Sequence, residues 1–257
     1  MAGTPQRRLR MAVASLRIGS DPERNLAHLL ERINEASNVG AQLICFPEYC
    51  LNPVIEHWVN LDQPIAALRT ACLEQRIWAV IGAESGDRKT RRNSILLIGP
   101  DGEIRERYDK IHLWRRERQF FCAGMAPARV IDIGVCRLGI VCCWDMAFAN
   151  TVAALAAGGA ELVLCPSRLV DAELDAEPLR ALPLARAFEN VLYFVLCDAV
   201  ADDTLSESMI CHPLGVRHRI AHTEGLLVAD LDFNALADLR AYYSDAVNTT
   251  TEACRPG

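Results

Sequence analysis

Residues 138–145 read LGIVCCWD, an apolar run of β-strand type that ends in two adjacent cysteines. A helical pattern begins soon after Asp145, so we expect the cysteines to lie at a turn between a strand and a helix. A thiol at such a turn is exposed, and the positive end of the helix dipole there favours the thiolate. Because neighbouring side chains on a strand point to opposite faces, we assign Cys142 to the core and Cys143 to a reactive site.

Two other segments each place one chemically active side chain at the end of an apolar run. Residues 46–49 read FPEY, where Glu48 lies partly desolvated at the mouth of a sheet and is suited to act as a base. Residues 108–113 read YDKIHL, where Lys110 supplies a fixed positive charge. With Cys143, these are the groups needed for covalent attack on a carbon–nitrogen bond. The thiol attacks, the carboxylate takes its proton, and the ammonium stabilises the oxyanion.

A histidine close to Lys110 leaves a second interpretation open. On a strand, positions 110 and 112 share a face, so His112 either flanks the lysine, satisfies a backbone group or serves as the base of a Cys–His pair. A papain-like Cys–His–Asn arrangement is disfavoured, because no histidine follows the cysteines in a convincing context. We therefore favour Glu48 as the base.

The composition indicates one globular domain with a substantial core. The chain has 257 residues, is 51% hydrophobic and carries a formal charge of −6. The acidic balance disfavours nucleic acid and anionic membranes as partners. We expect neither a membrane span nor a secretory signal. The eleven cysteines lie mostly in apolar runs, which predicts free thiols in a reducing cytoplasm, and the lack of Cys-x-x-Cys spacing predicts no metal and no cofactor.

Apolar strand-like runs alternate with helical patterns along the whole chain. Helices are expected at residues 21–39, 65–75, 149–157 and 179–189. Strands are expected at residues 9–16, 43–46, 78–83, 93–98, 104–108, 130–133, 136–142, 162–165, 191–197 and 225–230, with a further hairpin through 213–215. Strands that are apolar on both faces need cover on both sides. We therefore predict an α/β fold in which two mixed β-sheets pack together with helices on the outer faces, as a single domain over 1–257 with its core at about 9–245. The tail from residue 249 to 257 is expected to be poorly anchored.

Taken together, the three segments resemble the nitrilase, or carbon–nitrogen hydrolase, superfamily. Its pattern is Phe-Pro-Glu, then Lys-x-His-Leu, then Cys-aromatic-Asp. The resemblance implies that Glu48, Lys110 and Cys143 form a catalytic triad. The stretch ERQFFCAG, residues 117–124, fits a further family pattern and makes Glu117 the counterpart of a second, substrate-positioning glutamate. The resemblance also implies a four-layer α-β-β-α sandwich that pairs through its outer helices into a homodimer or a higher homo-oligomer.

The likeness covers roughly residues 9–245 and includes the landmarks Asn-Ser at 93–94, GPDG at 99–102, Pro-Ser at 166–167 and RAFEN at 186–190. There are departures as well. After Cys-aromatic-Asp, Ala147 stands where many members have arginine and Asn150 where they have glutamate, which disfavours the ω-amidase and carbamoyl amino-acid branches. Residues 197–199 read CDA where the family commonly has Asn and Gly, which changes the pocket or its rim.

The substrate-binding residues are expected to be Tyr49 and Trp144 in the pocket wall, with Arg168 contacting a substrate carboxylate. The favoured activity is hydrolysis of a small aliphatic amide through a cysteine thioester, with release of ammonia. N-carbamoyl amide hydrolysis, nitrile hydrolysis and acyl transfer are alternatives within the superfamily. A catalytically idle scaffold or binding protein is an alternative of another class, disfavoured because all four site residues are retained.

Overall fold

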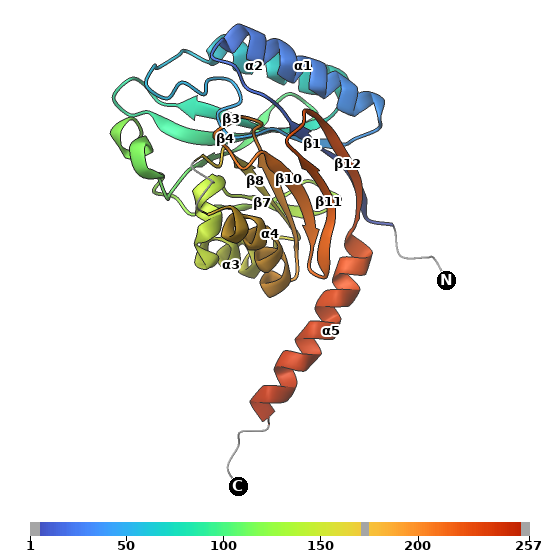
Figure 1. The fold of residues 1–257 in the computed structure, drawn as a ribbon. Coiled ribbons are helices and arrows are strands. Elements are labelled where there is room, and N and C mark those ends of the chain that lie inside the picture. The colour runs from blue at the N-terminus through green and yellow to red at the C-terminus, as the bar shows by residue number, and fades with distance from the viewer. Residues whose placement is uncertain (1–5, 171–174, 253–257) are drawn as a thin grey trace.

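The computed structural model describes residues 6–170 and 175–252, with side chains described as far as residue 244. Two six-stranded sheets lie face to face (Figure 1). The first has the order β12-β1-β2-β3-β4-β5 and consists of β1 (Arg8–Ser15), β2 (Leu43–Cys45), β3 (Trp78–Ser85), β4 (Arg92–Ile98), β5 (Ile104–Asp109) and β12 (Gly225–Asp232). The second has the order β11-β10-β9-β8-β7-β6 and consists of β6 (Val130–Asp132), β7 (Arg137–Ile140), β8 (Leu162–Ser167), β9 (Tyr193–Asp198), β10 (Glu207–His212) and β11 (Gly215–Ala221).

Both sheets follow one plan. Three parallel strands, β1-β2-β3 in one sheet and β7-β8-β9 in the other, are flanked by antiparallel strands on both sides. Helices α1 (Pro22–Asn38) and α2 (Asp62–Gln75) cover the first sheet, and α3 (Ala149–Ala157) and α4 (Ala176–Asn190) cover the second (Figure 1). The predicted α-β-β-α sandwich with two mixed sheets is therefore confirmed.

The side-chain alternation of β1 explains why its sequence is apolar throughout. Met11 and Val13 join the hydrophobic core between the two sheets, whereas Ala12 and Ala14 join the core under α1 and α2. Each face of the strand is thus buried in a different layer of the sandwich. Among the helices as described, none is long and apolar enough to cross a membrane.

Local signals set the ends of the elements. The side chain of Asp21 accepts hydrogen bonds from the backbone N–H groups of Glu23 and Arg24, and Pro22 occupies the first turn of α1. The expected strand over 162–165 is longer in the structure, since β8 continues through Pro166 to Ser167. Strand β7 pairs with β8 only as far as Leu164, so the missing N–H of the proline faces no strand partner.

The C-terminal region also differs from the expectation. A helix, α5 (Phe233–Glu252), follows β12 directly and extends away from the sandwich, as Figure 1 shows. No helix is expected there from the sequence, which predicts only a poorly anchored tail from residue 249. Residues 249–252 belong to the helix, and 253–257 lie outside the described part of the chain.

Candidate active site

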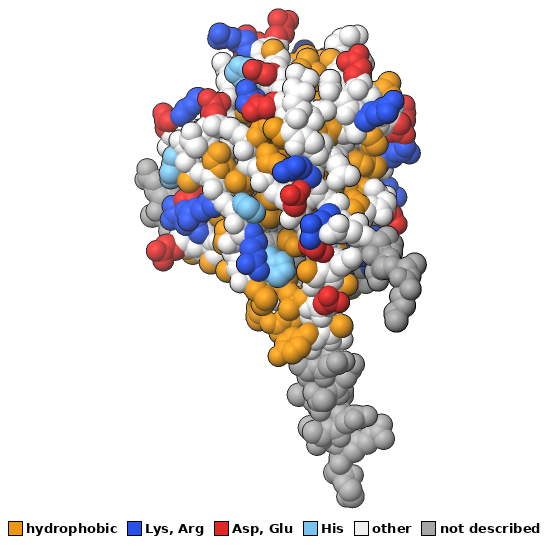
Figure 2. All heavy atoms as spheres, turned by 90° about the vertical axis from the view of Figure 1, so that its right-hand side faces the viewer, with side chains coloured by type: hydrophobic (Ala, Val, Ile, Leu, Met, Phe, Trp, Pro, Cys, Tyr) orange, Lys and Arg blue, Asp and Glu red, His pale blue; other side chains and the backbone are white. Residues whose placement is uncertain are grey.

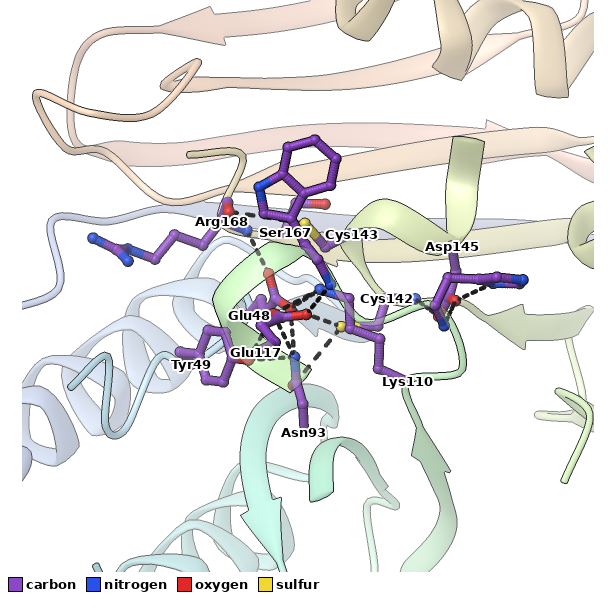
Figure 3. A network of polar contacts seen from close by, with 12 residues as sticks. Glu48, Tyr49, Asn93, Lys110, Glu117, Cys142, Cys143, Asp145, Ser167 and Arg168 are labelled. Carbon is purple, nitrogen blue, oxygen red and sulfur yellow. Dashed lines mark hydrogen bonds and ion pairs between the residues drawn. The ribbon is translucent and has the colours of Figure 1, made fainter. Parts of the chain in front are cut away.

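The three sequence segments meet at one edge of the sandwich. Glu48 follows β2, Lys110 follows β5, and Cys143 begins a short 3₁₀ helix, η2 (Cys143–Ala147), after β7. The Nζ atom of Lys110 lies 2.8 Å from Oε1 of Glu48 and 2.8 Å from Oε1 of Glu117. Figure 3 shows these side chains converging on one network of polar contacts.

The backbone at two site residues is strained. Tyr49 has φ = 55° and Cys143 has φ = 48°, in the left-handed region that residues with a β-carbon rarely adopt. Such conformations cost about 1–3 kcal/mol each and persist where the surrounding structure enforces them. At Cys143 the conformation turns the chain sharply between β7 and η2, so the alternation of side chains along a strand no longer applies there.

The two adjacent cysteines occupy different environments. Cys143 lines a cavity of about 440 Å³, together with Tyr49, Lys110, Glu117 and Arg168. Cys142 is fully buried and lines none of the described cavities. Its Sγ atom instead lies 3.2 Å from Oε1 of Glu48. The geometry therefore gives Cys143, not Cys142, access to a bound molecule.

The two carboxylate oxygens of Glu48 are unequally occupied. Oε1 accepts hydrogen bonds from Lys110 Nζ at 2.8 Å, Asn93 Nδ2 at 2.6 Å and Cys142 Sγ at 3.2 Å. Oε2 accepts one, from the backbone N–H of Arg168 at 2.9 Å. With a single donor against three on Oε1, Oε2 keeps the capacity to accept a proton among the described contacts.

Burial and charge set the two glutamates apart. Burial alone would raise the pKa of Glu48, but the charge of Lys110 and the hydrogen bonds to the carboxylate outweigh it and hold the pKa below its ordinary value. Burial raises the pKa of Glu117, and although the charge of Lys110 acts against this shift, burial together with the nearby charge of Glu48 keeps the pKa above its ordinary value. Of the two carboxylates around one ammonium, Glu48 therefore loses its proton at a lower pH than Glu117 and is the better placed to be ionised as a base.

Lys110 itself stays charged. Burial alone would lower its pKa, but the sulfur of Cys143, once ionised, and the carboxylate of Glu48 raise the pKa well above its ordinary value. Of the three N–H donors of the ammonium, two are used by Glu48 and Glu117.

The expectation that Cys143 is an exposed thiolate is wrong. The residue is only 5% exposed, and burial, followed by the charge of Glu48, raises the pKa of its thiol well above the ordinary value. The thiol points toward the carbonyl oxygen of Arg168, 3.8 Å away. Desolvation dominates over the dipole of a 3₁₀ helix of five residues, so this cysteine needs a base before it can react.

Asp145 forms hydrogen bonds with residues of the lysine segment, and these bonds account for the position of His112. Its carboxylate accepts hydrogen bonds from the Tyr108 hydroxyl at 2.6 Å and from the backbone N–H of His112 at 2.8 Å, and it lies 2.7 Å from Nδ1 of His112. The imidazole also stacks on Phe148 with ring centroids 3.6 Å apart. Because β5 ends at Asp109, Lys110 and His112 do not share a strand face as expected. The histidine partners Asp145 and not a cysteine.

Of the three expected substrate-binding residues, two line the main cavity and one does not. Tyr49 lines the 440 Å³ cavity, and its hydroxyl donates to Oε1 of Glu117 at 2.7 Å. The side chain of Arg168 also lines this cavity and lies 3.3 Å from Asp203. Trp144 lines only a small adjoining hollow and packs on Trp114 with ring centroids 4.3 Å apart.

Sequence reasoning missed two members of the network. Asn93 Nδ2 lies 2.6 Å from Glu48 Oε1 and 2.7 Å from the Tyr49 hydroxyl, which fixes both side chains. The Asn-Ser pair at 93–94 was noticed only as a landmark of the superfamily. Cys142 was assigned to the core, and no feature of the sequence indicated its contact with Glu48. Within the described residues, no group of three or more His, Cys, Asp or Glu side chains is arranged to hold a metal ion.

Comparison with known proteins gives concordant matches. The family model for carbon–nitrogen hydrolases matches residues 10–241. A nitrilase from Pyrococcus abyssi is 31% identical over 207 residues, covering 75% of this chain and 77% of the nitrilase. A chloroplastic omega-amidase from Arabidopsis thaliana is 27% identical over 265 residues, covering 92% and 71%. Among solved structures, a mutant of an amidase from Nesterenkonia sp. AN1 in complex with butyramide matches with a TM-score of 0.81 and 28% identity, over 93% of this chain and 96% of the amidase.

Proposed function

This chain belongs to the carbon–nitrogen hydrolase family, and on that premise we propose that it hydrolyses a small aliphatic amide through a thioester on Cys143, with release of ammonia. One observation supports this most directly: Cys143 lies in a cavity wall beside Lys110 and Glu117, with Glu48 behind them in the same network. The relatives named as amidases support the choice of an amide.

The first half of the proposed reaction forms the thioester. Oε2 of Glu48 takes the proton from Cys143, and the thiolate attacks the carbonyl carbon of the amide. The third N–H of Lys110 and the backbone N–H of Trp144 donate to the oxyanion of the tetrahedral intermediate. Glu48 then passes its proton to the amide nitrogen, the carbon–nitrogen bond breaks, and ammonia leaves.

The second half releases the acid. Glu48, again unprotonated, takes a proton from water as the water oxygen attacks the thioester carbonyl. When the carbon–sulfur bond breaks, the proton returns to Cys143 and the carboxylic acid departs. Glu117, held by Tyr49 and Lys110, orients the amide nitrogen.

The substrate contacts follow from the cavity wall. In this proposal Tyr49 and Trp144 border the reacting end, and Arg168 at the rim contacts an acidic group on the substrate. The pairing of Arg168 with the exposed Asp203 is compatible with that role, because a surface ion pair of this kind contributes little and can be exchanged.

Ammonia release over a panel of small amides, carbamoyl compounds and nitriles tests the proposal. Wild-type protein is expected to release ammonia from amides, and Cys143→Ala is expected to lose that turnover. The matched control is Cys136→Ala, which truncates another buried cysteine lining none of the described cavities. Turnover by Cys143→Ala comparable to that of the wild type would overturn the proposal.

Nitrile hydrolysis is the second candidate, favoured by the match to the Pyrococcus abyssi nitrilase. The same thioester would be reached from a nitrile by way of a thioimidate, after one water has been added. Ammonia release from nitriles but not from the corresponding amides would support this activity and exclude the first. If hydroxylamine diverts the acyl group in preference to water, acyl transfer is the better description.

We also propose that the protein is a cytoplasmic homodimer that pairs through its outer helices. Phe188 on α4 is 54% exposed and Tyr242 on α5 is 71% exposed, which is unusual for large apolar side chains. Figure 2 shows hydrophobic side chains gathered where α5 leaves the body. The ten cysteines with described side chains are all free, in keeping with a reducing compartment. A monomeric mass by light scattering would refute the dimer.

A further inference from the structure

Cys142, the residue before the proposed nucleophile, is not merely packed in the core. Its thiol also contacts the carboxylate of Glu48. Cys142 and Glu48 are both about fully buried, and Sγ lies 3.2 Å from Oε1 of the carboxylate. The alternative acceptor, Oδ1 of Asn93, is 3.9 Å away and neutral. A thiol has one hydrogen to donate, so the shorter contact to the charged oxygen takes it.

We propose that Cys142 is a positioning residue for the reaction: its thiol donates to Oε1 of Glu48 and thereby reserves Oε2 to take the proton of Cys143. The inference rests on the proposed function, in which Glu48 is the base. With Lys110 and Asn93, Cys142 is the third donor on Oε1, while Oε2 has only the backbone N–H of Arg168. Rotation of the carboxylate would break three contacts to Oε1.

The same environment keeps Cys142 out of the covalent chemistry. Burial, followed by the charge of Glu48, raises the pKa of its thiol well above the ordinary value, so the proton stays on sulfur and remains available to donate. Cys142 is also 0% exposed and lines none of the described cavities, so it has no exposed surface at which a substrate could bind. Two adjacent thiols thus take separate roles, one as nucleophile and one as hydrogen-bond donor to the base.

The contact has a consequence that can be measured. A donor on the carboxylate favours its ionised form, and the hydrogen bond from Cys142 is one of the causes that lower the pKa of Glu48. Without this donor, Glu48 is protonated at a higher pH and ceases to act as a base there. For any reaction that needs Glu48 to deprotonate Cys143, the rate falls as the pH is lowered. This acid limb of the pH–rate profile should therefore move to higher pH when the donor is removed.

The test uses iodoacetamide as the probe, so that it does not depend on an identified substrate. The rate of alkylation of Cys143 is followed by peptide mass spectrometry across pH 3–9 in the wild type, Cys142→Ala, Cys142→Val and Cys142→Ser. Both variants without a donor are expected to shift the acid limb upward by about 0.5–1 pH unit, because a thiol is a weak donor. Serine, which keeps a donor, is expected to restore the wild-type limb or move it lower.

The variants separate hydrogen bonding from packing. Valine fills the space of the cysteine and alanine does not, so a shared shift cannot come from a cavity in the core. Cys211→Ala truncates a fully buried cysteine on β10 and should lower stability without moving the limb. A uniform loss of rate with no shift in either donor-free variant would overturn the inference.

The outcome also distinguishes this inference from the proposed function. A shift of the labelling profile in a protein that turns over no amide would support the role of Cys142 and refute the hydrolase activity. If the wild type turns over amides and Cys143→Ala does not, but the labelling profile of Cys142→Val is unshifted, the hydrolase activity is supported and the role of Cys142 is refuted. A wild type in which Cys143 is not alkylated would overturn both.

Discussion

Gly82 on β3 lies directly under the backbone of Glu48. A β-carbon at this position would lie 2.8 Å from the α-carbon of Glu48, 2.4 Å from the carbonyl oxygen of Pro47 and 2.6 Å from the backbone nitrogen of Tyr49. These neighbours are backbone atoms, which cannot rotate away. The strand and the glutamate-bearing turn approach each other this closely only because residue 82 has no side chain.

Gly82→Ala is therefore expected to displace Glu48. The loss of activity should be larger than the addition of one methyl group would suggest. Misplacing a reacting group by about 1 Å can cost about 10²-fold in rate, and overpacking of this kind costs about 1–3 kcal/mol in stability. Amidase kinetics and urea unfolding measure the two effects. Gly19→Ala is the matched control, because the nearest atom to its β-carbon would be 3.8 Å away. Equal effects of the two substitutions would contradict the account.

Lys110→Met removes the cation that two buried carboxylates share. The free energy of unfolding at pH 7 is expected to fall by about 3–5 kcal/mol, because Glu48 and Glu117 are left without a counter-charge. The deficit should shrink at acid pH, because in the variant the two buried carboxylates, no longer held ionised by Lys110, take up protons and need no counter-charge. Urea unfolding at pH 7 and pH 4.5 measures it, with the exposed Lys89→Met as control. A deficit independent of pH would contradict the shared role of the lysine.

Asp145→Asn tests whether Asp145 joins the catalytic segments. The amide nitrogen replaces one of the two acceptor oxygens, so its N–H groups face either Tyr108 and the backbone of Cys142, which donate to Oδ2, or the backbone of His112, which donates to Oδ1. We expect a loss of about 2–4 kcal/mol in unfolding free energy and a lower kcat with little change in KM. Asp202→Asn, at a side chain that is 95% exposed, is the control. An Asp145→Asn variant as active and stable as the wild type would show that these contacts are dispensable.

Asp198 makes stability depend on pH in an unusual direction. Burial raises the pKa of this carboxyl from 3.8 to about 7. Its Oδ1 accepts from the backbone N–H of Leu169 at 2.9 Å, and its Oδ2 has no hydrogen-bond partner among the described residues. Between pH 4 and pH 7 the folded state therefore binds more protons at this site than the unfolded state, so stability falls as the pH rises.

Asp198→Asn removes that titration. Relative to this variant, the wild type should lose up to about 4 kcal/mol of unfolding free energy between pH 4 and pH 7. Urea unfolding of both proteins across this range gives the difference directly. If the difference stays constant with pH, Asp198 ionises normally in the folded protein.

Much of the fold could be predicted because the local sequence signals and the pattern of apolar residues indicate the same strands and helices. The apolar runs around Met11 and Ile44 can be stable only when covered on both faces, which already demands a layered sandwich. The cap at Asp21 and Pro22 placed α1 to within one or two residues. Helix α5 is absent from the expectation because its burial depends on distant residues: Phe233 and Leu236 join the core between the sheets, and Arg240 donates to the carbonyl of Val191. The extent of the single domain, residues 1–257 with a core at about 9–245, stays a prediction.

The site could be predicted only in part. Glu48, Lys110, Cys143 and Glu117 lie in segments with recognisable patterns, and the structure brings all four to one cavity and the network behind it. The state of the Cys143 thiol was predicted wrongly, since its pKa depends on burial by residues distant in the sequence. The contact between Cys142 and Glu48 likewise joins residues 94 positions apart and has no local signature.

The most direct test of the central claim is to find the acyl group. Protein quenched in acid during turnover of the best amide from the panel is digested, and fragmentation assigns the added acyl mass to one residue. We predict that the mass lies on Cys143 and disappears, together with ammonia release, in Cys143→Ala. An acyl group on Cys142 or any other residue, or turnover that persists in Cys143→Ala, would contradict the account.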